Sequence, residues 1–314
     1  MPSHAGCSRL LTPGTETPTT VDLRVLEACA RARGAAGAAA FVDSLRDADW
    51  GSLLPAAASH GMHGLLFRRL MDCCPAAAPA EARERLQDLQ QAAGRRGLRQ
   101  EARLLDVLDR LAEQGIQAVP FKGPLLAERV YSDVSMRVCS DLDVLVKARE
   151  VAAARDILLA AGWRVAGLTR PSGPSLLQAA ECELVLEHPA SGLYLELHWR
   201  TGPRFARASF PAEPLIARAG EMDVLGRHVP CLGDEDHFLV LIVHGATHCW
   251  DRLELVCTAA EFIAQERIAD WPLLLRRARA LGCRRRLLVA GALARDVAGV
   301  TLPAALAAAV RQDA

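Results

Sequence analysis

The sequence has no surplus of either charge and no apolar run long enough to cross a membrane. Its 37 lysine and arginine residues balance 37 aspartate and glutamate residues. A chain without a basic surplus has no overall field that attracts nucleic acid, so small or specific partners are favoured over bulk DNA or RNA. No window approaches the roughly 18 consecutive apolar residues that a membrane span requires. We therefore expect a protein that binds neither bulk nucleic acid nor membranes.

The ten cysteines include no Cys-x-x-Cys pair, so the sequence lacks the usual zinc-ribbon and thioredoxin-like motifs. Only Cys73 and Cys74 are adjacent. The first residues lack the basic start and apolar stretch of a secretory signal, and residues 1–20 have the Thr, Pro and Gly content of a disordered tail. Scattered thiols without such a signal favour a reduced, cytoplasmic location.

Hydrophobic periodicity divides the rest of the chain into three parts. Residues 21–113 repeat apolar positions at spacings of three and four, which predicts an N-terminal helical module. Residues 114–232 change to short runs typical of strands, and helical spacing returns in residues 233–314, the C-terminal helical module. Strands are expected at Ile116–Phe121, Leu142–Val146, Trp163–Val165, Glu183–Glu187 and Leu193–Trp199. The pattern predicts an α+β protein with a small mixed β-sheet between two helical modules.

An Asp-x-Asp pair, Asp141 and Asp143, belongs to a strongly hydrophobic strand segment. Residues two apart in a strand face the same side, with Cα atoms about 6.6 Å apart. Neighbouring carboxylates repel, and an apolar strand has little reason to hold them unless cations or donors satisfy their charge. The pair therefore predicts a divalent-metal site, although Asp-x-Asp also occurs in solvated turns and at helix starts.

The turn at Lys122 and Gly123 is a candidate phosphate site. Gly123 permits a backbone conformation denied to other residues, and Pro124 suits the first turn of a helix. The free N–H groups and positive dipole end of such a helix favour an anion, and Lys122 adds a full charge. An ordinary connection between a strand and a helix is the alternative.

The segment Leu193–Arg200 alternates apolar and polar residues with the period of a half-buried strand. Glu196 and His198 share its polar face. If that face lines the same pocket as Asp141 and Asp143, the three carboxylates could hold two Mg²⁺ ions roughly 3.5 to 4 Å apart. A sheet with one face in solvent is the alternative.

Taken together, these motifs resemble the uncharacterised nucleotidyltransferase family of the DNA polymerase beta-like superfamily. The resemblance extends from about Trp50 to Ile263 and depends on the order and spacing of several motifs. They are Lys122-Gly123, Tyr131, Arg137, Asp141 to Val146, Glu196 to Trp199, His244, and His248 to Arg252. In that superfamily a small mixed sheet carries a metal-binding Asp-x-Asp and a third acid on a neighbouring strand. The resemblance thus implies that residues 114–232 form the nucleotidyltransferase core.

The resemblance also implies roles for individual residues. Asp141, Asp143 and Glu196 correspond to the catalytic, metal-binding acids. Four residues are assigned to nucleotide binding: Lys122, Gly123, Arg137 and His198. Lys122 and Gly123 match the turn that holds the triphosphate. Thr258 departs from the pattern, because relatives typically have an aspartate there.

The resemblance implies transfer of a nucleoside monophosphate from a nucleoside triphosphate to an unknown acceptor, with release of pyrophosphate. Two Mg²⁺ ions are expected as cofactors, with Mn²⁺ as an alternative, and the acceptor is a small molecule, a peptide or a protein. His244 and His248 are expected to line the substrate pocket or to pack on the sheet. The alternatives are a glycosyltransferase that uses a nucleotide sugar, which the roughly 110 preceding helical residues disfavour, and a non-catalytic, nucleotide-binding or antitoxin-like partner.

Overall fold

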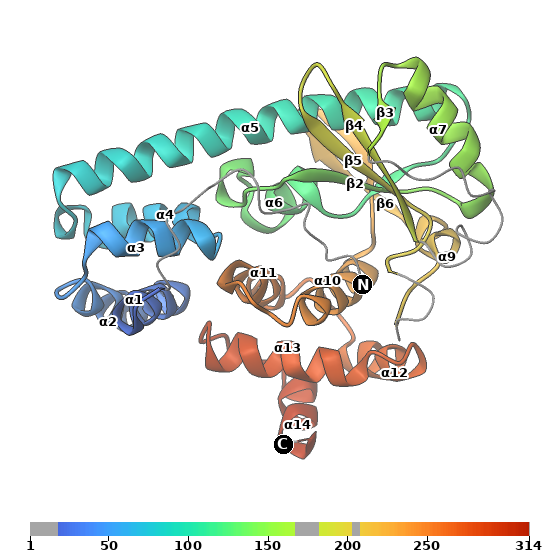
Figure 1. Ribbon diagram of the computed structural model, residues 1–314. Coiled ribbons are helices and arrows are strands. Elements are labelled where there is room, and N and C mark those ends of the chain that lie inside the picture. Colours follow the sequence, from blue (N-terminus) through green and yellow to red (C-terminus); the bar gives the residue numbers. More distant parts are fainter. Residues whose placement is uncertain (1–17, 167–181, 203–207, 314) are drawn as a thin grey trace.

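A computed structural model of the protein describes residues 18–166, 182–202 and 208–313. The expected disordered tail therefore falls largely outside the described residues. The N-terminal part is helical, and its last helix is much longer than the others (Figure 1). Its helices are α1 (Thr20–Arg31), α2 (Gly34–Ser44), α3 (Trp50–Ser59), α4 (His63–Cys73) and α5 (Ala80–Glu113), with a 3₁₀ turn η1 (Pro75–Ala77).

A five-stranded mixed sheet follows, which confirms the predicted α+β class. The strands lie in the order β1-β2-β5-β4-β3. Strands β2 and β5 are parallel, and the other neighbouring pairs are antiparallel. The strands are β1 (Val119–Pro120), β2 (Asp141–Leu145), β3 (Arg164–Val165), β4 (Glu183–His188) and β5 (Leu193–His198). All five predicted strand segments are therefore present, with bounds shifted by up to three residues.

One face of the sheet packs against two helices. Leu142, Val144 and Leu197 are fully buried in a core with the C-terminal half of α5 and with α7 (Val151–Ala160). Because side chains alternate along a strand, the intervening residues point to the opposite face. Helix α6 (Gly123–Tyr131) connects β1 to β2 by way of the 3₁₀ turn η2 (Val134–Met136), and the turn η3 (Ala148–Glu150) leads into α7.

A hairpin of β6 (Gly220–Val224) and β7 (Arg227–Cys231) follows the short helix α9 (Ala212–Ile216), and the sequence patterns did not predict it. Its two turn residues, Leu225 and Gly226, have φ values of 52° and 75°. Both central residues of the tight turn are therefore left-handed, a conformation for which Asn-Gly or Asp-Gly is the usual signal. Leucine at the first position hides that signal.

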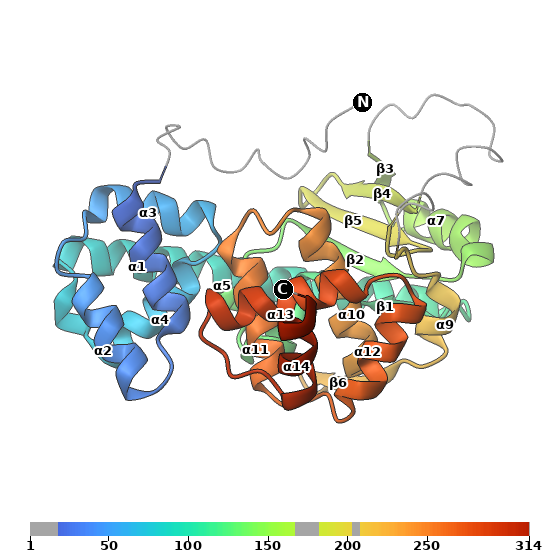
Figure 2. The same ribbon diagram turned by 90° about the horizontal axis from the view of Figure 1, so that it is seen from below.

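The C-terminal helices share a core with the N-terminal helices. Leu26 of α1, Phe41 of α2 and Phe262 of α11 belong to one buried cluster, and the two groups of helices lie side by side (Figure 2). An ion pair of 2.6 Å joins Arg33, directly before α2, to Glu261 of α11. The C-terminal helices are α10 (Asp234–Thr247), α11 (Leu253–Ala264), α12 (Trp271–Ala280), α13 (Arg284–Asp296) and α14 (Ala304–Asp313). No helix among the described residues is long and apolar enough to cross a membrane.

Glu101 of α5 gives a prediction about pH-dependent stability. Its side chain is buried, and burial together with the Glu128 carboxylate raises the pKa of Glu101 from 4.5 to about 7. The folded protein therefore holds a proton on Glu101 that the unfolded chain releases near pH 4.5, so this stabilising contribution is lost as the pH rises through about 7. The Glu101→Gln variant is expected to unfold at a higher temperature than the unmodified protein at pH 8 but not at pH 4.5.

Thermal melts at both pH values measure this effect. Glu113→Gln, at the exposed C-terminal end of the same helix, is the control and should leave the melting temperature within about one degree at either pH, as for most surface substitutions. An equal shift at pH 4.5 and pH 8 in Glu101→Gln would contradict the titration of Glu101.

Candidate active site

The parallel register of β2 and β5 brings acids from the two strands together. Asp143 lies opposite Glu196, and Leu145 lies opposite His198. Asp143 and Glu196 therefore project from the same face of the sheet, the one turned away from α5 and α7. The two acids of adjacent strands form the centre of the candidate site.

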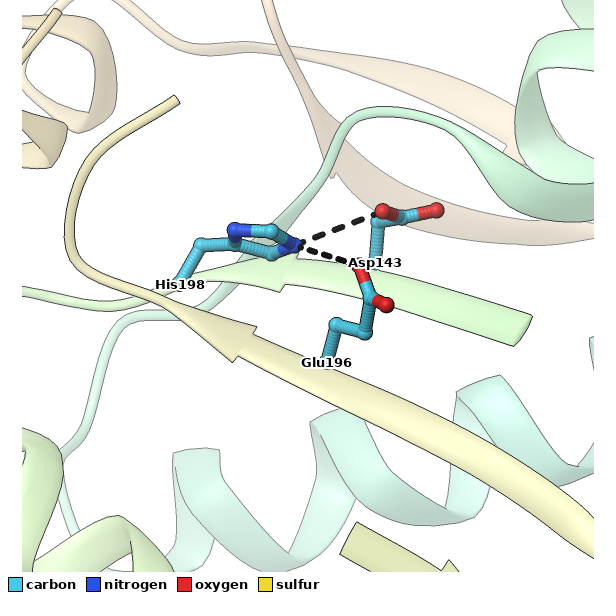
Figure 3. Close-up of side chains that lie close together, drawn as sticks. All are labelled: Asp143, Glu196 and His198. Carbon is cyan, nitrogen blue, oxygen red and sulfur yellow. Dashed lines mark hydrogen bonds and ion pairs between the residues drawn. The ribbon is translucent and has the colours of Figure 1, made fainter. Parts of the chain in front are cut away.

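Asp143, Glu196 and His198 point toward one another (Figure 3). The Nε2 atom of His198 is 3.4 Å from Asp143 Oδ1 and 3.2 Å from Glu196 Oε2. One ligand atom from each of the three residues lies within 4.8 Å of the others, so the cluster could hold a metal ion. The second ring nitrogen of His198, Nδ1, is 3.2 Å from a carboxylate oxygen of Glu183 on β4.

Lys122 neutralises Asp143. Its Nζ atom forms an ion pair with Asp143 Oδ1, and the Asp143 side chain is only 2% exposed. Helix α6 begins at Gly123, directly after this lysine, and Gly123 has a φ of +63°. A Cβ atom at that position would lie 3.2 Å from the Asp141 carbonyl oxygen, so both the backbone conformation and the close approach to β2 favour glycine.

The charged forms of Asp143, Lys122 and His198 stabilise one another. Burial alone would raise the pKa of Asp143, but the Lys122 ammonium and His198 hold it below its usual range. Burial opposes the charge on Lys122 as well, and the Asp143 and Glu196 carboxylates raise the pKa of that amine. Burial also opposes a charge on His198, yet its contacts with Asp143, Cys182 and Glu196 raise the imidazole pKa well above its ordinary value. The site thus holds an ammonium and an imidazolium beside its carboxylates.

Asp141 lies outside the tight cluster but within its electrostatic field. Burial, followed by the Asp143 and Glu196 carboxylates, raises the pKa of Asp141 to about 6, and Lys122 opposes the shift. The local cations therefore do not fully satisfy this third acid. A divalent cation near the three carboxylates would relieve the repulsion between them.

The donor chemistry fits Mg²⁺ or Mn²⁺. Carboxylate oxygens are the ligands that these hard cations prefer, and Asp141, Asp143 and Glu196 provide them from two adjacent strands. Asp143 Oδ1 is buried without a hydrogen bond of good geometry and has only ion-pair partners. The Nε2 atom of His198 lies near both the Asp143 and the Glu196 carboxylates, so a proton on Nε2 would hold them in place.

Arg137 was assigned to nucleotide binding from the resemblance, and the structure places it beside an acid that the sequence patterns missed. The Nη2 atom of Arg137 is 3.8 Å from Oε1 of Glu254 on α11, and Arg252 is 3.1 Å from the same oxygen. The Glu254 side chain is 4% exposed. Glu254 was missed because one glutamate at the start of a helix is indistinguishable in sequence from an ordinary surface charge.

His244, His248 and Thr258 are the remaining residues that the sequence analysis singled out. The rings of His244 and His248 lie 4.5 Å apart, as expected for positions four apart at the end of a helix. Burial, with the Lys122 cation as the next cause, lowers the pKa of His244 well below its ordinary value, so this ring is neutral. Thr258 is buried on α11, and its hydroxyl is 3.4 Å from the Tyr131 hydroxyl. A hydroxyl pair thus occupies the position at which the family resemblance implied an aspartate.

The fold is a mixed sheet flanked by helices, and the site combines acids on two adjacent strands with a cationic turn at the start of a helix. The model of the family described as "Uncharacterised nucleotidyltransferase" matches residues 46–299. The chain therefore belongs to this family, which confirms the resemblance inferred from the motifs.

No curated protein matches the chain. Among solved structures, the chain is similar to the one titled "Solution Structure of Antibiotic-Resistance Factor ANT(2'')-Ia Reveals Substrate-Regulated Conformation Dynamics". The identity is 16% and the TM-score 0.40, and the match covers 58% of this chain and 92% of that chain.

Proposed function

We propose that the protein is a Mg²⁺-dependent nucleotidyltransferase that transfers a nucleoside monophosphate from a nucleoside triphosphate to an acceptor. Asp141, Asp143 and Glu196 would hold the metal ions. The observation that carries the proposal is the convergence of Asp143 and Glu196 across two parallel strands, with Asp141 two residues away on the same face. Bound Mg²⁺ would neutralise and orient the triphosphate and stabilise the charge that develops during phosphoryl transfer.

The residues of the chain have separate tasks in this reaction. Lys122 and the free N–H groups at the start of α6 bind the negatively charged triphosphate. His198 holds the Asp143 and Glu196 carboxylates in place. An acceptor oxygen or nitrogen attacks the α-phosphorus and loses its proton to Glu196 or Asp143. The new bond to phosphorus forms as the bond to the β-phosphate oxygen breaks, and pyrophosphate leaves.

The acceptor in this proposal is a small molecule, a peptide or a protein. The reaction takes place in the cytoplasm. All nine cysteines among the described residues are free thiols, which suits a reducing compartment. Arg137 would contribute to nucleotide binding from its buried position beside Glu254.

Metal removal tests the proposed function without knowledge of the acceptor. Each of the four nucleoside triphosphates is titrated into the protein with Mg²⁺, and binding is followed by calorimetry. At least one is expected to bind, with affinity about tenfold or more lower in EDTA and restored by excess Mg²⁺. Release of pyrophosphate in the presence of candidate acceptors completes the test.

Two outcomes would reject the proposal. One is the absence of metal-dependent binding for all four triphosphates. The other is turnover of a nucleotide sugar with release of a nucleoside diphosphate, which would favour the glycosyltransferase alternative, since an Asp-x-Asp pair occurs in both classes of enzyme.

A further inference from the structure

A histidine that the sequence patterns missed lies at the base of the phosphate-binding turn. His237, in the first turn of α10, is 0% exposed. Its Nε2 atom is 2.7 Å from the carbonyl oxygen of Phe121, the residue directly before Lys122. A side chain of the C-terminal helices thus contacts the backbone of the turn between β1 and α6.

The partners of His237 permit a single tautomer. A carbonyl oxygen only accepts hydrogen bonds, so Nε2 must carry the proton that it donates to Phe121. The Nδ1 atom is 3.0 Å from Nη1 of Arg129, and a guanidinium only donates, so Nδ1 must be the bare acceptor. Burial and the Arg129 charge lower the pKa of His237 to about 3, in agreement with a neutral ring.

Arg129 is itself fixed from several sides. Its Nη1 atom also donates to the carbonyl oxygen of Leu232 at 2.6 Å, and its Nη2 atom is 2.7 Å from an oxygen of Asp234. Its side chain is 7% exposed, and the guanidinium lies 5.9 Å from the centre of the Phe262 ring. The network therefore connects α6, the start of α10 and the turn before Lys122, and Arg129 and His237 at its centre are both buried.

Both backbone polar groups of Phe121 are engaged. Its N–H donates to the carbonyl oxygen of Asp143 at 3.2 Å, and its C=O accepts from His237. Its ring meets the His198 ring edge-on, with centres 5.0 Å apart. Phe121 thus joins the acid on β2, the cation on β5 and the buried network of α10, and it sets the place from which Lys122 extends.

We propose that His237 is a positioning residue: through the Phe121 carbonyl it fixes the turn so that Lys122 stays beside Asp143 and the start of α6 faces the triphosphate. This proposal rests on the nucleotidyltransferase function proposed above. Replacing His237 with leucine would remove the donor to Phe121 and leave Arg129 without one acceptor. Glutamine keeps an amide donor near the place of Nε2 and a carbonyl oxygen that accepts from Arg129.

Lys122 can be followed by chemical labelling because the chain has only two lysines, Lys122 and Lys147. Acetylation by an N-hydroxysuccinimide ester, quantified by mass spectrometry, gives the ratio of Lys122 to Lys147 modification without any nucleotide. Amines react in their neutral form, and the ion pair with Asp143 keeps Lys122 charged. We expect the ratio to rise about fivefold in His237→Leu and to stay within about twofold of the unmodified protein in His237→Gln.

His188→Leu is the matched control. His188 is also buried, lies 3.0 Å from the Ser191 hydroxyl and meets the Trp163 ring edge-on. It pairs with Leu193, at the opposite end of β5 from His198. Loss of this histidine should lower the melting temperature without changing the Lys122 labelling ratio.

The catalytic part of the proposal is tested by kinetics. His237→Leu is expected to raise KM for the triphosphate about tenfold with a smaller change in kcat, and His237→Gln is expected to restore most of it. A purely structural role would lower the amount of folded protein without moving KM. Should His237→Leu not fold, ¹⁵N NMR of the imidazoles in the unmodified protein reads the tautomer directly, and a proton on Nδ1 of His237 would overturn the proposal.

The possible failures can be told apart. A labelling ratio unchanged in folded His237→Leu, or a changed ratio with unchanged KM, would overturn the positioning role of His237. Absence of triphosphate binding by the unmodified protein would instead reject the proposed function, whatever the labelling ratio shows.

Discussion

Asp143→Asn is expected to lower the rate of pyrophosphate release about 10³-fold or more while leaving the fold intact. Asparagine preserves the shape of the side chain but provides one neutral oxygen in place of the charged carboxylate. It therefore loses affinity for a divalent cation and no longer balances Lys122 and His198, both of which contact Asp143 Oδ1. Pyrophosphate release and the circular dichroism spectrum, measured on the same preparation, check the expectation.

Asp156→Asn is the control for this substitution. Asp156 belongs to α7, is 65% exposed and pairs with its neighbour Arg155 at 2.8 Å, so its replacement should change neither activity nor stability measurably. Pyrophosphate release from Asp143→Asn at the rate of the control would remove the central acid from the proposed mechanism.

Lys122→Met is expected to lower turnover of the triphosphate and to strengthen the binding of Mn²⁺. Without the ammonium, the triphosphate loses its contact at the start of α6, and turnover should fall about 10²-fold or more. Asp143 also loses the ammonium that forms an ion pair with its Oδ1 atom. Mn²⁺ added without nucleotide should therefore bind several times more tightly to Lys122→Met than to the unmodified protein. Mn²⁺ binding is measured by electron paramagnetic resonance.

Lys147→Met is the control for Lys122→Met, because Lys147 is the other lysine of the chain. Lys147 pairs with Glu150 at 3.7 Å near the start of α7, and Lys147→Met should leave turnover and Mn²⁺ binding unchanged. Weaker Mn²⁺ binding in Lys122→Met would show that the lysine does not compete with the metal for Asp143.

The strands of the site could be predicted because their patterns are local. Leu193 to His198 alternates strictly, and Leu195 and Leu197 are buried while Glu196 remains partly exposed. Alternation specifies the face of a residue, but it does not specify which strands are neighbours. That the strands of Asp143 and Glu196 are neighbours was inferred from the family resemblance and not from periodicity. Their parallel register, which places Asp143 opposite Glu196, was not predicted.

The buried polar residues around the site could not be predicted for a different physical reason. His237 recognises a backbone carbonyl, and every residue has one, so its partner leaves no mark on the sequence. Glu254 depends on Arg137, which is far away in the chain and reaches it only after the helices pack. Long-range pairs of this kind are consequences of the tertiary structure.

The core shared by α1–α4 and α11–α13 constrains the order of events during synthesis on the ribosome. The N-terminal helices are made before the helices that cover their apolar side. Translation adds about 5 to 20 residues per second, so this apolar surface waits for seconds before its cover arrives. The period between the synthesis of these two groups of helices is therefore one in which the N-terminal helices expose apolar surface that the folded protein buries.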